Sequence, residues 1–264
     1  MGTDESCMAW IRDEIGRAVG LPREFGGIPL DEIGATGWGL LHAAEAAQAA
    51  GGVALKGARI AVQGFGAVGM HAARFLTRAG AVLVAAADSR ATIADPGGLD
   101  VDALIALKER GASVGDHARG ERLAADAVID ADCEIWIPAA RPDVIDRRNV
   151  GRLRAKIVLE GANIPVTPDA EEELHRRGVL CVPDFIANAG GVICAALEYH
   201  GASESAALQS VAERIRRNSD EVLARMKKDG VTPRRAAVDT AVARVKKAMD
   251  RRRGSLFSAA PGFV

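Results

Sequence analysis

The sequence is poor in aromatic residues and cysteine, and it has almost no net charge. Aromatic residues fill 4% of the 264 positions, so the core has to be built from Ala, Val, Ile and Leu, which suits close packing of helices on a sheet. Four cysteines stand far apart, with no Cys-x-x-Cys pair and no histidine at zinc spacing, which predicts free thiols in a reducing compartment and no metal site. A net charge of −1 gives no indication of a nucleic-acid or membrane partner.

Long apolar runs and a secretion signal are absent as well. The longest apolar run covers residues 79–87, which is far too short to cross a bilayer. The first five residues are acidic and lack the hydrophobic region of a signal peptide. With 48% hydrophobic and 26% charged residues the composition is that of an ordinary globular protein, and we expect it to be cytoplasmic.

The order of patterns along the chain predicts an α/β protein in three parts. Residues 1–33 form an amphipathic helix (5–19) and a Gly/Pro-rich hinge loop, 34–200 a dinucleotide-binding domain, and 201–264 a helical extension with a tail. Continuous apolar strands alternating with helices are typical of a Rossmann-like, doubly wound and mostly parallel sheet. The predicted strands are 59–63, 81–87, 133–137, 156–159 and 179–182, and the predicted helices after residue 33 are 36–50, 67–79, 101–110, 142–148, 169–177, 186–200, 203–228 and 233–250.

A glycine-rich turn joins the first predicted strand to the helix that follows it. Glycine triplets alone are a weak signal, but this one sits between a strand and a helix, as a dinucleotide-binding turn requires. Gly64 would make the tight turn, Gly66 would let the backbone approach a pyrophosphate, and Gly69 would let the helix pack on the strand. The helix N-terminus would hold the phosphates. The residues assigned to this contact are Gly64, Phe65, Gly66, Ala67, Val68 and Gly69.

An acidic residue, Asp88, ends the next predicted strand, about twenty positions after Gly69. In dinucleotide-binding domains an acid there accepts hydrogen bonds from the adenosine ribose, and its charge repels a 2′-phosphate. Asp88 therefore favours NAD, and the neighbouring Ser89 is also assigned to the cofactor contact. Arg90 follows at once and can accommodate a 2′-phosphate, which leaves NADP open.

Four further segments are uninformative singly but share a location. They are 34–39, 137–140, 160–165 and 188–192, and all but the last lie at or just beyond a predicted strand end or at the start of a helix. Open α/β sheets bind ligands at the carboxyl ends of their strands, where Asn163 and Asn188 could hold a carboxamide or a ribose.

Taken in order, these segments resemble the glutamate/leucine/phenylalanine/valine dehydrogenases, with glutamate dehydrogenases as the most similar group. The resemblance runs from residue 1 to about residue 250. It is carried by Gly2-Thr3, Met8-Ala9-Trp10, Ala35-Thr36-Gly37, Val62-Gln63-Gly64-Phe65-Gly66, Pro138-Ala139-Ala140, Glu160-Gly161-Ala162-Asn163 and Ile186-Ala187-Asn188-Ala189-Gly190-Gly191-Val192.

The resemblance implies an activity and a set of site residues. Such enzymes interconvert an L-amino acid with a 2-oxo acid and ammonia, transferring hydride to NAD(P), and the full-length members are homo-oligomers. Thr36 and Asn163 would lie near the nicotinamide and its ribose, and Asn188 at the junction of cofactor and substrate. Ala139 and Ala140 would border the adenosine, and Val192 and Ala195 would face the substrate side chain.

The chain departs from the family pattern in two ways. Family members carry the catalytic lysine and aspartate in an N-terminal domain, whereas this sequence begins with residues that resemble the stretch just after that aspartate, and its first lysine is Lys56. Asp4 falls on the wrong side of Gly2-Thr3 to replace it. We therefore expect no catalytic residue in this chain and no turnover by it alone. Ala195 also stands where glutamate-specific members usually carry a serine, which puts specificity for glutamate in doubt.

Two other functions compete with the cofactor half of a dehydrogenase. One is a free-standing nucleotide-binding module that regulates or assembles a full-length enzyme. The other is nucleic-acid binding by the basic segment 244–253. Val238, Val242, Val245 and Met249 form an apolar stripe on that helix, so its charges are better explained as the opposite, solvated face. We expect a dinucleotide partner, and an amino acid or 2-oxo acid only together with the N-terminal domain.

Overall fold

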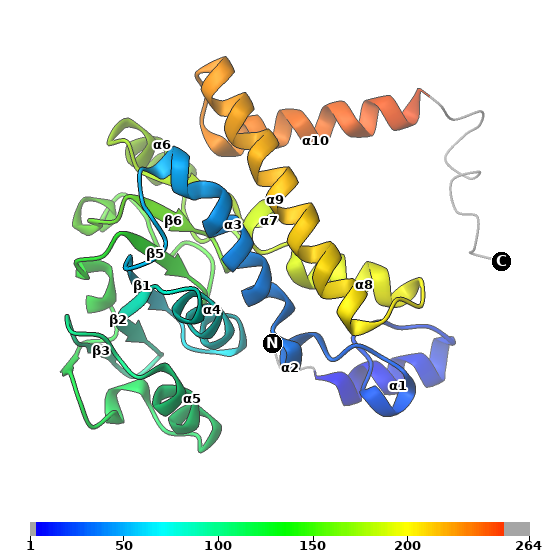
Figure 1. Cartoon of the computed structure of the whole chain (residues 1–264), viewed down its shortest axis with the longest axis horizontal. Coiled ribbons are helices and arrows are strands. Elements are labelled where there is room, and N and C mark those ends of the chain that lie inside the picture. Colours follow the sequence, from blue (N-terminus) through cyan, green and yellow to red (C-terminus); the bar gives the residue numbers. More distant parts are fainter. Residues whose placement is uncertain (1–3, 251–264) are drawn as a thin grey trace.

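The computed structural model describes residues 4–250 and is built around one seven-stranded sheet with the order β4-β3-β2-β1-β5-β6-β7 (Figure 1). Five neighbouring strands from β2 to β7 are parallel, and β3 and β4 add an antiparallel edge next to β2. This confirms the mostly parallel, Rossmann-like sheet. The strands are β1 (Arg59–Gln63), β2 (Val82–Ala87), β3 (Thr92–Ala94), β4 (Glu121–Leu123), β5 (Ile135–Pro138), β6 (Ile157–Leu159) and β7 (Leu180–Val182).

Helices cover both faces of the sheet, and two long helices follow it. The α-helices are α1 (Glu5–Ile15), α2 (Leu30–Ile33), α3 (Ala35–Gly51), α4 (Ala67–Arg78), α5 (Val101–Glu109), α6 (Pro168–Arg176), α7 (Asp184–Ala187), α8 (Gly190–Tyr199), α9 (Glu204–Asp229) and α10 (Pro233–Met249). Four short 3-10 helices, η1 (Arg23–Phe25), η2 (Val114–Asp116), η3 (Ala127–Asp130) and η4 (Val150–Arg152), connect them.

The core has two layers because side chains alternate between the faces of each strand. Ile60 and Val62 point into the layer beneath α3 and α4, while Ala61, between them, joins the layer beneath α6. Trp136 is completely buried in this second layer, and its indole N–H donates to Val128 O at 3.0 Å. Both faces are therefore covered, as the continuous apolar strands predict.

The C-terminal helices pack on the sheet domain. α9 runs along α3, where the Trp38 indole donates to Leu208 O at 3.0 Å (Figure 1). α10 begins against β7 and α9 and then projects away from the body of the molecule. The apolar stripe on α10 is exposed in this chain. The boundaries at residues 33 and 200 stay predictions, and the predicted tail beyond residue 250 lies outside the described residues.

Three predicted helices are wrong in extent or existence. The helix expected at 142–148 does not form, because Asp143 takes φ 51° and Ile145 pairs with Val166 as an isolated bridge. The helix expected at 186–200 is split into α7 and α8 at Asn188. The first helix stops at Ile15, since Gly16 adopts the left-handed conformation that ends helices. The antiparallel strands β3 and β4 were not predicted.

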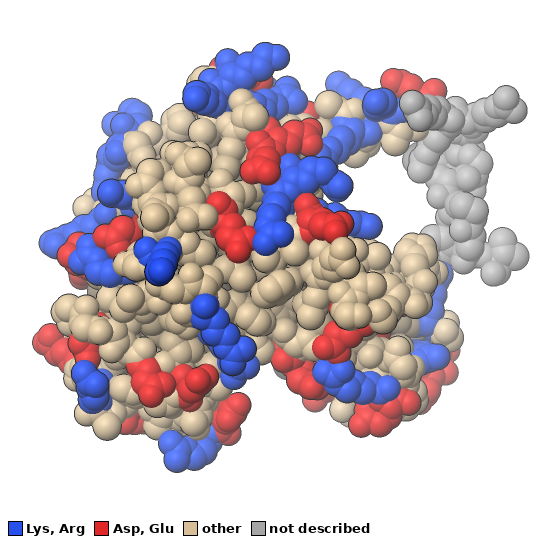
Figure 2. All heavy atoms as spheres, viewed as in Figure 1, with Lys and Arg blue, Asp and Glu red and all other residues tan. Residues whose placement is uncertain are grey.

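The surface charge and the hydropathy of the helices are relevant to nucleic-acid and membrane partners. Figure 2 shows basic and acidic side chains interspersed over the visible face, with wide areas of other residues between them. Among residues 4–250, no helix has the length and apolar character needed to cross a membrane. The cysteines are free, and Cys133, Cys181 and Cys194 are buried, as expected for structural thiols.

Candidate functional site

The carboxyl ends of the parallel strands bring the predicted site segments to one edge of the sheet. β1 ends at Gln63 before the glycine turn, β5 at Pro138 before Ala139, and β6 at Leu159 before Glu160. Asp88 follows the end of β2. This is the edge at which open parallel sheets bind ligands.

Two glycines of the turn are required by close packing. Gly64 has φ 92°, and a Cβ there would lie 2.5 Å from the Cβ of Ala140. A Cβ on Gly69 would lie 2.0 Å from Gly64 O, which no real structure tolerates. The turn after β1 therefore lies directly against the loop after β5, and α4 starts close to its own strand.

Gly66 differs from both, because nothing in the protein fills the space around it. It is exposed with φ −96°, and a Cβ there would have no heavy atom within 4 Å. It also precedes the first turn of α4, whose N–H groups have no partners within the helix. The turn leaves an open approach to free N–H groups. Phe65, between these glycines, is 1% exposed, and its backbone N–H donates to Ala87 O at 2.9 Å.

Thr36 lies where the first turns of three helices meet. It shares a small recess with Ala67 and Val68 of α4, and a Cβ on Gly191 of α8 would lie 3.1 Å from its Oγ1. Gly190 packs so tightly on α3 that a Cβ there would lie 2.1 Å from Ala35 O. The structure thus joins Thr36 to the glycine turn and to the segment around Asn188.

Asn163 and Asn188 are hydrogen-bonded to each other. The Asn188 amide nitrogen donates to the Asn163 side-chain oxygen at 2.9 Å. Asn163 stands in an unusual turn, since Ile164 has φ 42° without being a glycine. The Asp184 carboxylate holds this turn by accepting from Ile164 N at 2.8 Å. The pair predicted to contact the nicotinamide side is thereby fixed in place.

A buried ionic cluster stands behind this pair. The Arg234 guanidinium, from α10, contacts Asp184 at 2.9 Å, Glu160 at 2.7 Å and Glu171 at 2.6 Å. Burial raises the pKa of Glu160 to about 8, against the opposing effect of Arg234. Glu160 Oε1 and Glu171 Oε1 lack a hydrogen-bond partner. Sequence reasoning missed Arg234, because it is remote in the chain and belongs to no motif of that edge.

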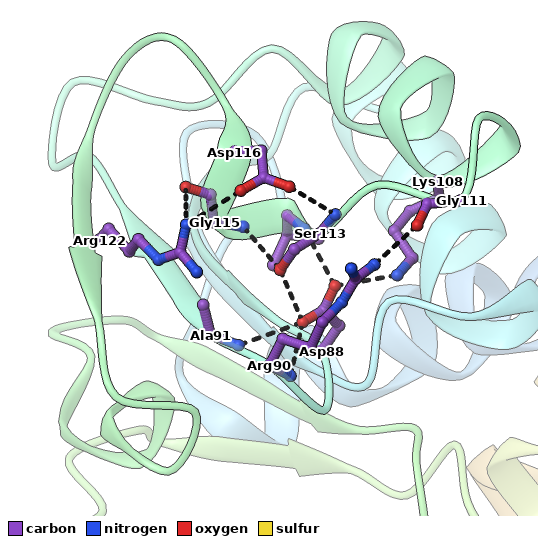
Figure 3. A network of polar contacts seen from close by, with 10 residues as sticks. Asp88, Arg90, Ala91, Lys108, Gly111, Ser113, Gly115, Asp116 and Arg122 are labelled. Carbon is purple, nitrogen blue, oxygen red and sulfur yellow. Dashed lines mark hydrogen bonds and ion pairs between the residues drawn. The ribbon is translucent and has the colours of Figure 1, made fainter.

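Asp88 is turned into the protein and is only 6% exposed (Figure 3). Burial raises its pKa, but hydrogen bonds from Lys108 and neighbouring groups outweigh that effect and hold the pKa well below its usual range. Asp88 itself and the adjacent Ser89 line a cavity of about 380 Å³ together with Gln63, Trp136 and Arg141. The cavity lies between the ends of β1, β2 and β5.

The two predicted substrate residues lie on α8. Val192 is 75% exposed, and Ala195, one turn further on, is half-buried. Val192 follows directly on Gly191, the residue that approaches Thr36. Within the described part of the chain, no group of three or more His, Cys, Asp and Glu side chains is arranged to hold a metal ion.

The fold and this edge place the chain in a known class of enzymes. A family model for glutamate/leucine/phenylalanine/valine dehydrogenase matches residues 26–253. The chain belongs to this family, which confirms the resemblance seen in its motifs.

Curated relatives and solved structures agree with the family. The chain is 35% identical over 266 residues to the glutamate dehydrogenase of Aeropyrum pernix and 40% identical over 209 residues to that of Thermotoga maritima. These matches cover 94% and 75% of this chain, but only 63% and 50% of the relatives. The hetero-hexameric glutamate dehydrogenase of Thermus thermophilus, in its Leu-bound form, superimposes with a TM-score of 0.86 at 31% identity, covering 97% of this chain and 64% of that one.

Proposed function

We propose that this chain binds a nicotinamide dinucleotide, NAD or NADP, along the carboxyl edge of its sheet, with the pyrophosphate on the N-terminus of α4. The open approach at Gly66 carries this proposal, because Gly64 and Gly69 are explained by packing and Gly66 is not. Free N–H groups and the positive end of the helix dipole suit phosphate oxygens. The residues present fit the cofactor.

The remaining candidates would divide between the two halves of the dinucleotide. Thr36, Asn163 and Asn188 lie on the nicotinamide side, where side-chain amides can orient a carboxamide and ribose hydroxyls. Ala139 and Ala140 border the adenosine side next to the cavity that Ser89 lines. The cofactor supplies the hydride acceptor, while this chain positions it and shields it with α3 and α8.

The reaction served would be the oxidative deamination of an L-amino acid, with glutamate as the first candidate. The relatives named above are glutamate dehydrogenases, and those of Saccharolobus shibatae and Pyrobaculum calidifontis are described as NADP-specific and NADP(+)-dependent. The candidate residues on the nicotinamide side, Thr36, Asn163 and Asn188, supply neither the general acid nor the general base that such chemistry requires. We therefore expect these 264 residues to bind the cofactor in the cytoplasm, and amino-acid turnover to need groups from the rest of the relatives' length.

A nucleotide-binding module that acts on another subunit is the second candidate function. Large apolar side chains are exposed on three helices: Trp10 and Ile15 on α1, Val192 and Tyr199 on α8, and Val245 and Met249 on α10. Exposed apolar side chains on several elements favour coverage by further protein. Catalysis by a mixture of this chain with a full-length dehydrogenase, and by neither component alone, would favour this function.

A fluorescence titration of the full chain with NADH and NADPH tests the cofactor site. We expect saturable binding, weakened on the order of tenfold or more, about 1.4 kcal/mol, in Gly66→Ala. That variant should fold normally, since its Cβ meets no protein atom. Gly151→Ala is the matched control, because Gly151 has equally open surroundings and an ordinary φ. Absence of saturable binding, or equal affinities in Gly66→Ala and the unmodified chain, would overturn the proposal.

A further inference from the structure

The Asp88 carboxylate has no capacity left for a ribose. A carboxylate offers about four lone-pair positions. Five donors already share them, at 2.9 to 3.2 Å (Figure 3). Oδ1 accepts from Arg90 N, Ala91 N and Ser113 Oγ, and Oδ2 accepts from Lys108 Nζ and Val114 N.

Releasing this carboxylate toward a ligand would be costly. It ties the end of β2 to α5 and to the loop before η2, through Lys108 and Ser113. Turning it outward would leave the Lys108 ammonium and the Val114 N–H without their acceptors, and buried donors that lose a partner are expensive. Asp88 is therefore a structural anchor of its loop in this chain.

The charge that the loop presents outward is positive. The negative charge of Asp88 is matched by Lys108, at 2.9 Å. Ser89 and Arg90 are exposed, and the Arg90 guanidinium donates to Gly111 O at 2.8 Å. Arg90 has no carboxylate within ion-pair distance in the part of the chain that the structure describes. Asp116, the acid influenced by Arg90, is itself paired with Arg122 at 2.9 Å.

We propose that this site prefers the 2′-phosphorylated dinucleotide, with Ser89 and Arg90 receiving the 2′-phosphate. The proposal rests on the function proposed above and deepens it. A phosphate dianion gains a hydroxyl donor from Ser89 and a planar set of N–H donors from Arg90. The unphosphorylated cofactor gains no acceptor from Asp88, which is the group that would select it. The acid at the end of β2, which in other dinucleotide-binding domains indicates NAD, therefore does not indicate NAD in this chain.

Competition between nucleotides tests the preference directly. The full chain is titrated with NADPH and with NADH, and bound NADPH is then displaced with 2′,5′-ADP or 5′-AMP, which report on the adenosine end alone. We expect NADPH to bind about tenfold tighter or more, which corresponds to about 1.4 kcal/mol. The preference should shrink as salt rises, because Arg90 is exposed and its charge is screened.

Variants separate this preference from general weakening. Arg90→Ala and Ser89→Ala should weaken NADPH binding several-fold more than they weaken NADH binding. Lys108→Met should reduce the ratio of the two affinities, because it leaves the Asp88 charge unmatched. Arg110→Ala is the control, since this exposed arginine bonds only to Ala106 O of its own helix.

The outcomes distinguish the two proposals. If neither dinucleotide binds, the proposed function itself fails. If both bind and NADH is equal or tighter, the preference is refuted and the cofactor site stands. Equal weakening of both dinucleotides in Arg90→Ala would also refute it, because a group at the 2′-phosphate acts mainly on NADPH.

Discussion

Arg234 is the residue whose removal tests the buried cluster most severely. Its guanidinium is the only cation in contact with Glu160, Glu171 and Asp184 in the described chain, and these carboxylates are between 0% and 9% exposed. In Arg234→Met the apolar stem is retained and the charge is lost. The three carboxylates would then have to coexist without a counter-ion or take up protons.

The magnitude of this effect depends on pH in a defined direction. Breaking a buried ion pair costs about 3–5 kcal/mol, and the partial exposure of Arg234 favours the lower value near neutral pH. Without Arg234, the folded-state pKa values of Glu160 and Glu171, which burial already raises, rise further above their unfolded values. The folded state then binds more protons than the unfolded state, so stability falls as pH rises. Each extra bound proton steepens this fall by about 1.4 kcal/mol per pH unit, or about 3 kcal/mol between about pH 5.5 and 7.5.

Urea unfolding of both proteins at these two pH values measures the effect. The adjacent Arg235 supplies the control, since it lies on the same helix, is 69% exposed and makes one surface ion pair with Asp239. Arg235→Met should cost less than about 1 kcal/mol at either pH. The reasoning is refuted if Arg234→Met costs the same at both pH values, or no more than Arg235→Met.

Three further changes have distinct expected results. In Glu160→Gln the fall in stability between about pH 5 and 8 should flatten in urea unfolding. The folded pKa of about 8 lies above the unfolded value, so in this interval the native Glu160 keeps a proton that the unfolded chain has lost. An unchanged slope would contradict this. Gly69→Ala should destabilise the fold by several kcal/mol in thermal unfolding, since its Cβ would overlap Gly64 O; a normal melting temperature would show that α4 can shift. Trp38→Phe should cost about 1 kcal/mol in urea unfolding through the lost hydrogen bond to Leu208 O, and no loss would mean that water replaces it.

Much of the fold could be predicted because local patterns determine it. The strand–turn–helix from Arg59 to Arg78 follows from an apolar run, a glycine turn and an amphipathic segment within twenty residues. The helix predicted at 142–148 was wrong, although the composition of this segment suits a helix. Ile145 instead pairs with Val166, a contact between segments that local composition does not report. At the break between α7 and α8, the Asn188 side chain likewise bonds to a partner, Asn163, that lies 25 residues away in sequence.

The site was predicted to the level of segments, and its side-chain orientations were not. The position of Asp88 after β2 could be read from strand spacing, but the direction of its carboxylate depends on Lys108 and Ser113. Arg234 could not be found, since three acids from separate elements define its role only after folding. Periodicity reports on neighbours along the chain and carries no information on such distant contacts.

The contact of Arg234 with Glu160 and Asp184 has a consequence for where the cofactor-binding unit ends. A shortened protein that stops at residue 200 would retain every strand and every proposed cofactor ligand, yet it would lack the cation that holds the acids behind Asn163. We therefore expect the smallest autonomously folding unit to extend into α10. A domain boundary drawn between α8 and α9 would assign the proposed cofactor ligands to one unit and Arg234, which holds the acids behind Asn163, to another.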